Sequence, residues 1–112
     1  MEIIESEDGE VTVIEISGRL WGEPEGESLS ETLSDLKGKG CSKIVIDMEG
    51  ISLMNSSGLG SLIAGMKSFR EIGGDMKLAN ANERIQTILK ITKLNQVFKT
   101  YDNRDEAISS FS

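Results

Sequence analysis

The sequence contains no histidine and only one cysteine, Cys41. Histidine is the usual general base for a serine nucleophile and the commonest metal ligand, so its absence excludes a hydrolase built on a serine, histidine and aspartate triad. A single cysteine forms no disulfide within the chain, and without histidine it leaves a structural zinc ion with no ligand set. We therefore expect neither this kind of catalysis nor a metal site.

Long apolar runs and clustered basic residues are also missing. No stretch approaches the roughly 20 apolar residues needed to cross a bilayer, and the N-terminus has an acidic rather than a basic flank. The 12 basic residues are scattered among 19 acidic ones, which gives a formal net charge of −7. These features predict a cytoplasmic protein with no membrane span, no secretion signal and no nucleic-acid partner.

The glycines near the middle of the chain do not complete a nucleotide-binding motif. After Gly58-Leu59-Gly60 the dinucleotide fingerprint requires a third glycine, and this chain has Ile63 there. The glycine, lysine and hydroxyl residues of a P-loop do not occur in the required order either. We therefore predict a non-enzymatic protein without a bound cofactor. Small-molecule binding at a helix N-terminus is a weaker alternative.

Length and composition favour one folded domain. The chain has 112 residues, of which 38% are hydrophobic and 28% charged, as is ordinary for a globular protein. Apolar patterning predicts strands over residues 3–5, 11–16, 44–46, 76–79 and 97–101. It also predicts helices that begin at residues 28, 57, 82 and 103, with a loop over residues 18–27 and a link over residues 48–54.

These elements follow the order ββαβαβαβα. Alternating strands and helices imply right-handed crossovers between parallel strands, and the opening hairpin supplies antiparallel pairing. Ser28 and Glu31 form a capping box at the expected start of the first helix. We predict a single α/β domain over residues 1–112, with a mixed β-sheet and about four helices.

Asn55, Ser56 and Ser57 lie where the sequence leads from a strand into the second helix, at the carboxyl edge of the predicted sheet. In α/β folds this edge usually holds the functional site. One interpretation is that one of these residues only caps the helix. The other is a phosphorylation site, since Gly58 leaves room around the hydroxyl and a helix N-terminus tolerates a phosphate. Both interpretations can hold together.

Trp21 is the only tryptophan, in a loop rich in glycine and acid. Such a residue can be a lid over the core, which is the interpretation we favour, or an exposed anchor for a partner. Four methionines are expected to fill the core rather than to form a binding stripe: Met48, Met54, Met66 and Met76.

Four segments share a family pattern and follow one another along the chain: residues 13–20, 47–60, 72–76 and 94–108. The most specific of them, from Asp47 to Gly60, contains the two adjacent serines. With these segments the chain resembles the STAS domains, named for sulphate transporters and anti-sigma factor antagonists. The resemblance covers essentially the whole chain and implies the STAS fold.

The resemblance implies an anti-sigma factor antagonist. Such a protein binds an anti-sigma factor serine kinase, frees a sigma factor and is inactivated when the kinase phosphorylates it. Ser57 matches the phosphoacceptor of the family. The expected partner-binding residues are Asn55, Ser56, Gly58, Leu59 and Trp21. A second possibility is a subunit that is not switched, as in sensory or lipid-transport complexes that contain related domains.

Two positions depart from the family pattern. Family members often carry an acid just before the two serines and another after the Gly-Arg-Leu element, where this chain has Asn55 and Trp21. If these two loops lie together, an amide and an indole in place of two charges make the surface less repulsive to phosphate and more adhesive.

Overall fold

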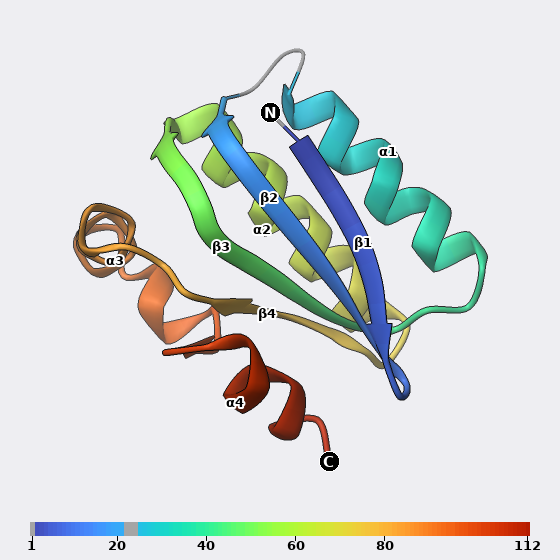
Figure 1. Cartoon of the computed structure of the whole chain (residues 1–112). Coiled ribbons are helices and arrows are strands. Elements are labelled where there is room, and N and C mark those ends of the chain that lie inside the picture. The colour runs from blue at the N-terminus through green and yellow to red at the C-terminus, as the bar shows by residue number, and fades with distance from the viewer. Residues whose placement is uncertain (1, 22–24) are drawn as a thin grey trace.

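Five strands form one mixed sheet in the computed structural model, which describes residues 2–21 and 25–112. The strands are β1 Glu2–Asp8, β2 Val11–Leu20, β3 Lys43–Met54, β4 Asp75–Ala79 and β5 Thr100–Tyr101. They lie across the sheet in chain order, β1-β2-β3-β4-β5. β1 pairs antiparallel with β2, and each later pair is parallel (Figure 1). The predicted mixed sheet with an opening hairpin is confirmed.

Among the described residues, four α-helices and one short 3₁₀-helix accompany the strands: α1 Glu25–Gly38, α2 Ser56–Glu71, α3 Glu83–Ile91, η1 Leu94–Gln96 and, after the last strand, α4 Arg104–Ser109. α1 and α2 lie side by side on one face of the sheet, and α4 lies on the opposite face (Figure 1). The predicted element order and fold class are confirmed. Within residues 2–21 and 25–112, no helix is long and apolar enough to cross a membrane.

Two cores form because successive side chains of β2 point to opposite faces of the sheet. Ile14 and Ile16 face the main core under α1 and α2, whereas Val11 and Val13 belong to a smaller core under α4. The main core also contains four buried methionines, which confirms that prediction: Met48, Met54, Met66 and Met76.

The prediction that the central strand ends at Asp47 is wrong, because β3 continues to Met54. Its register with β2 shifts at two places in this stretch, so the period-two pattern that would reveal a strand is broken. Gly50 pairs with Ser17 at one shift, and a Cβ there would come 2.7 Å from the Ser17 Cβ. The residues predicted as a link therefore form a bulged strand.

Further boundaries differ from the predictions. β2 continues through Leu20, and α1 begins at Glu25 rather than at Ser28, so Ser28 with Glu31 does not open the helix as a capping box. Residues 22–24 of the predicted loop lie outside the described residues. The last strand is only Thr100–Tyr101, because η1 precedes it and Val97 is the C-cap of that 3₁₀-helix.

Candidate functional site

The junction between β3 and α2 holds the predicted serines at the carboxyl edge of the sheet. We call residues 55–58 the serine loop. Asn55 is the N-cap of α2 in an extended conformation, with a φ of −103°. Its Oδ1 accepts a hydrogen bond of 2.8 Å from the backbone N–H of Gly58. Helix capping is therefore confirmed for Asn55.

The end of β2 fixes the position of the serine loop. The Leu20 carbonyl accepts a hydrogen bond of 3.3 Å from the Asn55 N–H. Gly58 packs against the same carbonyl, and a Cβ at Gly58 would come 2.0 Å from the Leu20 oxygen. Figure 1 shows the ends of β2 and β3 meeting the start of α2. The backbone of β2 therefore requires glycine at position 58. This close contact explains Gly58 better than the predicted need for space around a serine hydroxyl.

Ser56 and Ser57 are the first two residues of α2, and both are exposed. Ser57 accepts a hydrogen bond of 3.3 Å at its carbonyl from the Ser61 hydroxyl. Its own hydroxyl has no hydrogen-bond partner among the described residues. The first turn of α2 contains no acidic residue. The hydroxyl is thus accessible beside the positive end of the α2 dipole, where added negative charge is stabilised.

The structure divides the predicted partner-binding residues into two groups. Asn55, Ser56 and Trp21 are exposed and can contact a partner directly. Gly58 is buried and Leu59 is only 6% exposed, within the main core. These two residues therefore hold the loop against the sheet, and their direct contact with a partner would require the loop to move.

Trp21 is not a lid over the core, since 38% of the residue is exposed and it lies outside both cores. The guanidinium of Arg19 lies over its ring, with Cζ 4.4 Å from the ring centroid. The favoured interpretation of Trp21 as a lid is therefore wrong, and its role as an exposed anchor for a partner stays a prediction. Our sequence interpretation missed Arg19, because it placed residues 18–27 in a loop, whereas β2 continues through Arg19 to Leu20.

A second polar cluster lies on β3, away from the serine loop. The Asp47 carboxyl is 4% exposed and accepts hydrogen bonds from the Asn80 amide at 3.0 Å, the Glu49 N–H at 3.1 Å and Arg104 Nη2 at 2.8 Å. Arg104 also pairs with Glu15. Burial raises the pKa of Asp47, but these hydrogen bonds and the Arg104 charge outweigh it and hold that pKa below its ordinary value. The cluster attaches α4 to the sheet, so its role is structural.

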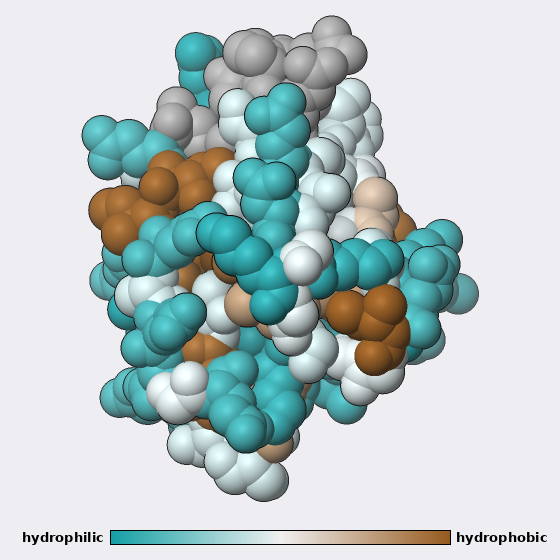
Figure 2. Space-filling view, turned by 90° about the vertical axis from the view of Figure 1, so that its right-hand side faces the viewer, coloured by the Kyte–Doolittle hydropathy of each residue, from teal (hydrophilic) through white to brown (hydrophobic). Residues whose placement is uncertain are grey.

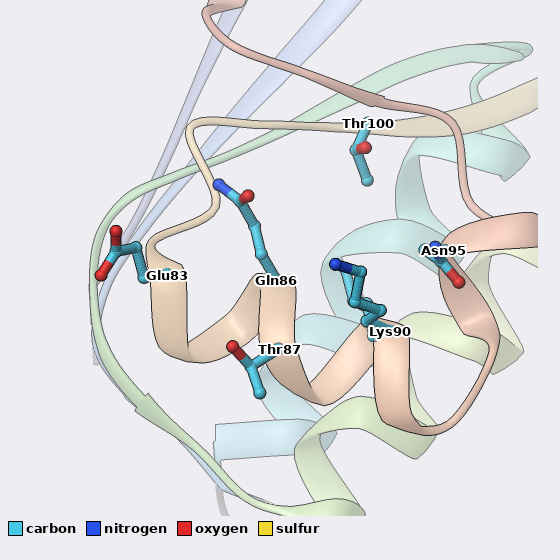
Figure 3. A pocket seen from close by; sticks show the side chains of 7 residues that line it. Glu83, Gln86, Thr87, Lys90, Asn95 and Thr100 are labelled. Atoms are coloured by element: carbon cyan, nitrogen blue, oxygen red, sulfur yellow. The ribbon is translucent and has the colours of Figure 1, made fainter.

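One surface groove among the described residues lies apart from the serine loop. This groove lies between α3 and the η1–β5 segment and has a volume of about 410 Å³. Figure 3 shows its lining, which is mostly polar and includes Glu83, Gln86 and Lys90. No residue of the serine loop lines it. Figure 2, a view from the side of α1 and β1, shows mostly hydrophilic surface with separate apolar areas. No group of residues that could hold a metal ion occurs in the described part of the chain.

Comparison with known sequences gives one family. The sequence model of the STAS domain matches residues 3–107. A candidate anti-sigma factor antagonist of Thermotoga neapolitana is 34% identical over 70 residues. The matched segment covers 62% of this chain and 62% of the length of that relative. The anti-sigma F factor antagonist of Paenibacillus polymyxa is 24% identical over 99 residues, which are 88% of this chain and 85% of that protein.

Solved structures with several different names share the fold. A candidate anti-sigma factor antagonist from Thermotoga maritima gives a TM-score of 0.90 at 23% identity, over 96% of this chain and 92% of that one. The phosphorylated form of the Bacillus cell fate determinant SpoIIAA gives a TM-score of 0.77 at 21% identity, over 99% of this chain and 100% of that one. A sulfate transporter family protein from Wolinella succinogenes gives a TM-score of 0.80 at 17% identity, over 92% of this chain and 85% of that one. At these identities the likeness establishes the fold alone.

Proposed function

Because the chain belongs to the STAS domain family, we propose that it is an anti-sigma factor antagonist that acts by binding rather than by catalysis. In this proposal the unphosphorylated chain binds an anti-sigma factor serine kinase and thereby releases a sigma factor. Phosphate on Ser57 breaks the contact. The observation that carries the proposal is the exposed Ser57 hydroxyl in the first turn of α2, with no hydrogen-bond partner among the described residues.

Electrostatics at the start of α2 support a switch that leaves the fold intact. A phosphate adds a charge of about −1.5 to −2 at neutral pH. On Ser57 this charge would lie near the positive end of the helix dipole and near free backbone N–H groups, which stabilise anions. No acidic residue in the first turn of α2 opposes it. The charge of the docking surface therefore changes while the packing beneath it, through Gly58 and Leu59, is preserved.

The docking surface of this proposal is the exposed part of the serine loop together with Trp21. Asn55, Ser56 and Ser57 present polar groups from the start of α2, and Trp21 follows the strand that packs on the loop. Gly58 and Leu59 contribute by fixing the loop rather than by touching the partner.

Phosphate mapping tests the proposal. The chain is incubated with the anti-sigma factor serine kinase of its own organism and ATP, and the modified residue is located by mass spectrometry. We expect one phosphate on Ser57, none in Ser57→Ala, and full modification in the control Ser56→Ala. We also expect Ser57→Asp to bind the kinase more weakly than the wild type. Phosphate on another residue, or none, would contradict the proposal.

A second candidate function is a STAS subunit that is not switched, within a larger sensory or lipid-transport complex. It is favoured by Asn55, which occupies the position where members of the family often carry an acid. Purification of the chain with its partners from its own organism separates the two functions. A complex whose composition is the same in wild type, Ser57→Ala and Ser57→Asp supports the constitutive subunit.

A further inference from the structure

We propose that Arg19 and Trp21 act together as an anchor for the partner of the serine loop. The partner would meet them with an apolar recess that receives the indole and a carboxylate on its rim that receives the guanidinium. This inference rests on the proposed function, because its partner is the same anti-sigma factor kinase.

The two side chains stack on each other where β2 ends. Arg19 belongs to β2 and Trp21 follows its last residue. Arg19 Cζ lies 4.4 Å from the centroid of the Trp21 ring, within the range of a cation–π contact. Trp21 is 38% exposed. An aromatic ring that is already stacked on a neighbouring side chain loses less conformational freedom when a partner covers it than an unsupported ring does. Tryptophan and arginine are also the residue types most enriched at the energetic centres of interfaces.

The anchor is continuous with the serine loop through Leu20. This residue lies between Arg19 and Trp21 in the chain and is completely buried. Its carbonyl accepts the Asn55 N–H at 3.3 Å and packs against Gly58. Trp21 is therefore one peptide unit, about 3.8 Å between Cα atoms, from the residue on which the loop rests. One partner surface can cover both.

The other large apolar side chains with exposed surface do not share this position. Ile4, Ile72, Ile91 and Val97 lie on β1, the C-cap of α2, α3 and the C-cap of η1, respectively. Isolated exposed apolar residues of this kind are normal on a protein surface. Among the described residues, only Trp21 combines exposure, a stacked cation and adjacency to the serine loop.

The hydrogen-bonding capacity of Arg19 indicates the chemistry of the partner. Arg70 and Arg104 both donate to carboxylates of this chain. Arg19 donates to no carboxylate or carbonyl within residues 2–21 and 25–112. A guanidinium that loses water at an interface needs acceptors, and a carboxylate matches its fork with two parallel hydrogen bonds. The indole below requires an apolar recess.

The experiment measures the Kd of the kinase for the full chain and for single variants by calorimetry, at low and at high ionic strength. We expect Trp21→Ala to weaken binding about 30-fold and Trp21→Phe less, and Arg19→Ala to weaken binding about 10-fold. Arg19→Lys should recover only part of the affinity, since lysine lacks the bidentate fork. The control Ile91→Ala alters a side chain on α3 that is 76% exposed and should bind as the wild type does.

Two further readouts report the anchor itself. Because the contact with a carboxylate is ionic, the Kd of Arg19→Ala should depend less on ionic strength than that of the wild type. Trp21 is the only tryptophan, so a chain labelled with 5-fluorotryptophan gives one fluorine resonance. We expect that resonance to shift when the kinase binds and to remain at its free position when Ser57 is phosphorylated.

The outcomes separate the anchor from the switch. A wild-type chain that binds the kinase and is phosphorylated on Ser57, while Trp21→Ala and Arg19→Ala bind equally well, overturns the anchor and leaves the switch in place. If the Kd of Arg19→Ala depends on ionic strength as strongly as that of the wild type, the proposed contact of Arg19 with a carboxylate of the partner is wrong. A wild-type chain that neither binds nor is phosphorylated overturns the proposed function, and the anchor with it.

Discussion

Gly58 and Gly60 lie two residues apart at the start of α2, but a side chain would meet different surroundings at each. A Cβ at Gly58 would come 2.0 Å from the Leu20 oxygen, whereas a Cβ at Gly60 would have nothing within 4 Å. We expect Gly58→Ala to lower the free energy of unfolding by about 2 to 3 kcal/mol, because backbone atoms must move apart. We expect Gly60→Ala to raise it by about 0.5 to 1 kcal/mol, since alanine is the better helix former.

Urea denaturation of the two variants beside the wild type checks this pair of predictions. The shifts in midpoint should have opposite signs. Equal stability of Gly58→Ala and the wild type would mean that β2 and α2 are not in close contact at this position.

Asn55 offers a second prediction at the residue scale. Its Oδ1 accepts the Gly58 N–H at 2.8 Å, so Asn55→Ala leaves a helix donor without its cap. We expect Asn55→Ala to lower the free energy of unfolding by about 1 kcal/mol and Asn55→Asp to leave it nearly unchanged, because aspartate caps as well as asparagine. Thermal and urea unfolding provide the measurement. A loss in Asn55→Asp as large as that in Asn55→Ala would show that the cap is not the stabilising contact.

The sequence predicted part of this site because capping is local. Asn55 and the N–H that it caps are three residues apart, within one helical turn, and residue type alone favours such a cap. The contact of Gly58 with Leu20 joins two distant parts of the chain, so no local pattern encodes it. The exposure of Trp21 was misjudged, because burial depends on the folded surroundings and residue type alone does not determine it.

At the scale of elements, α4 is short and is attached to the sheet by cations near both of its ends. Arg104 in its first turn donates to Asp47, and Lys77 of β4 donates to the Ser110 carbonyl and hydroxyl at 3.2 and 2.8 Å. Lys77 Nζ also lies 4.0 Å from the centroid of the Phe111 ring. A helix of six residues is not stable by itself, so these contacts and the small core beneath it hold α4 in place.

Removing the Arg104 side-chain charge should destabilise the fold in a pH-dependent way. We expect Arg104→Met to lower the free energy of unfolding by about 2 kcal/mol at neutral pH, since the buried Asp47 carboxylate loses charged hydrogen bonds. The pKa of Asp47 is lower in the folded state than in the unfolded state. Its contribution to stability is therefore complete above the unfolded pKa of about 3.9 and is lost as pH falls through the folded value.

The difference between Arg104→Met and the wild type should accordingly shrink as pH falls below about 3.9. Urea denaturation at a series of pH values gives the measurement. Arg84→Met, an exposed arginine on α3, is the matched control and should stay within about 0.5 kcal/mol of the wild type at every pH. A difference that does not vary with pH would remove Asp47 as its cause.

Element order followed from the sequence more reliably than element boundaries. The leucines of α1 and the apolar positions of α2 repeat at the helical period, which is a local signal. β3 was cut short because its bulge at Gly50 breaks the alternation, and a bulge is determined by the partner strand. The pair of Asp47 and Arg104 spans 57 residues. Only the folded topology brings it together, so no spacing rule could find it.

At the scale of the whole molecule, a phosphate adds to a chain whose net charge is already −7. The repulsion between the roughly two charges of a phosphate and the other acidic groups of the chain is small, because solvent screens charges beyond roughly 10 Å at ordinary ionic strength. The local field at the start of α2 acts in the opposite direction and favours an anion. A switch at Ser57 can therefore alter binding without lowering the stability of the domain.

This balance gives a prediction with a matched pair of variants. Ser57→Asp and Ser57→Asn have nearly the same shape and differ in one charge. We expect Ser57→Asp to unfold at a free energy about 0.3 to 1 kcal/mol higher than Ser57→Asn at low salt, through the interaction with the helix N-terminus, and this difference to shrink as salt is added. Urea denaturation should also give one m-value for both, which shows that the same surface is exposed on unfolding. If Ser57→Asp is instead the less stable of the two, charge at this position weakens the fold, and phosphorylation would act by unfolding α2 rather than by changing its surface.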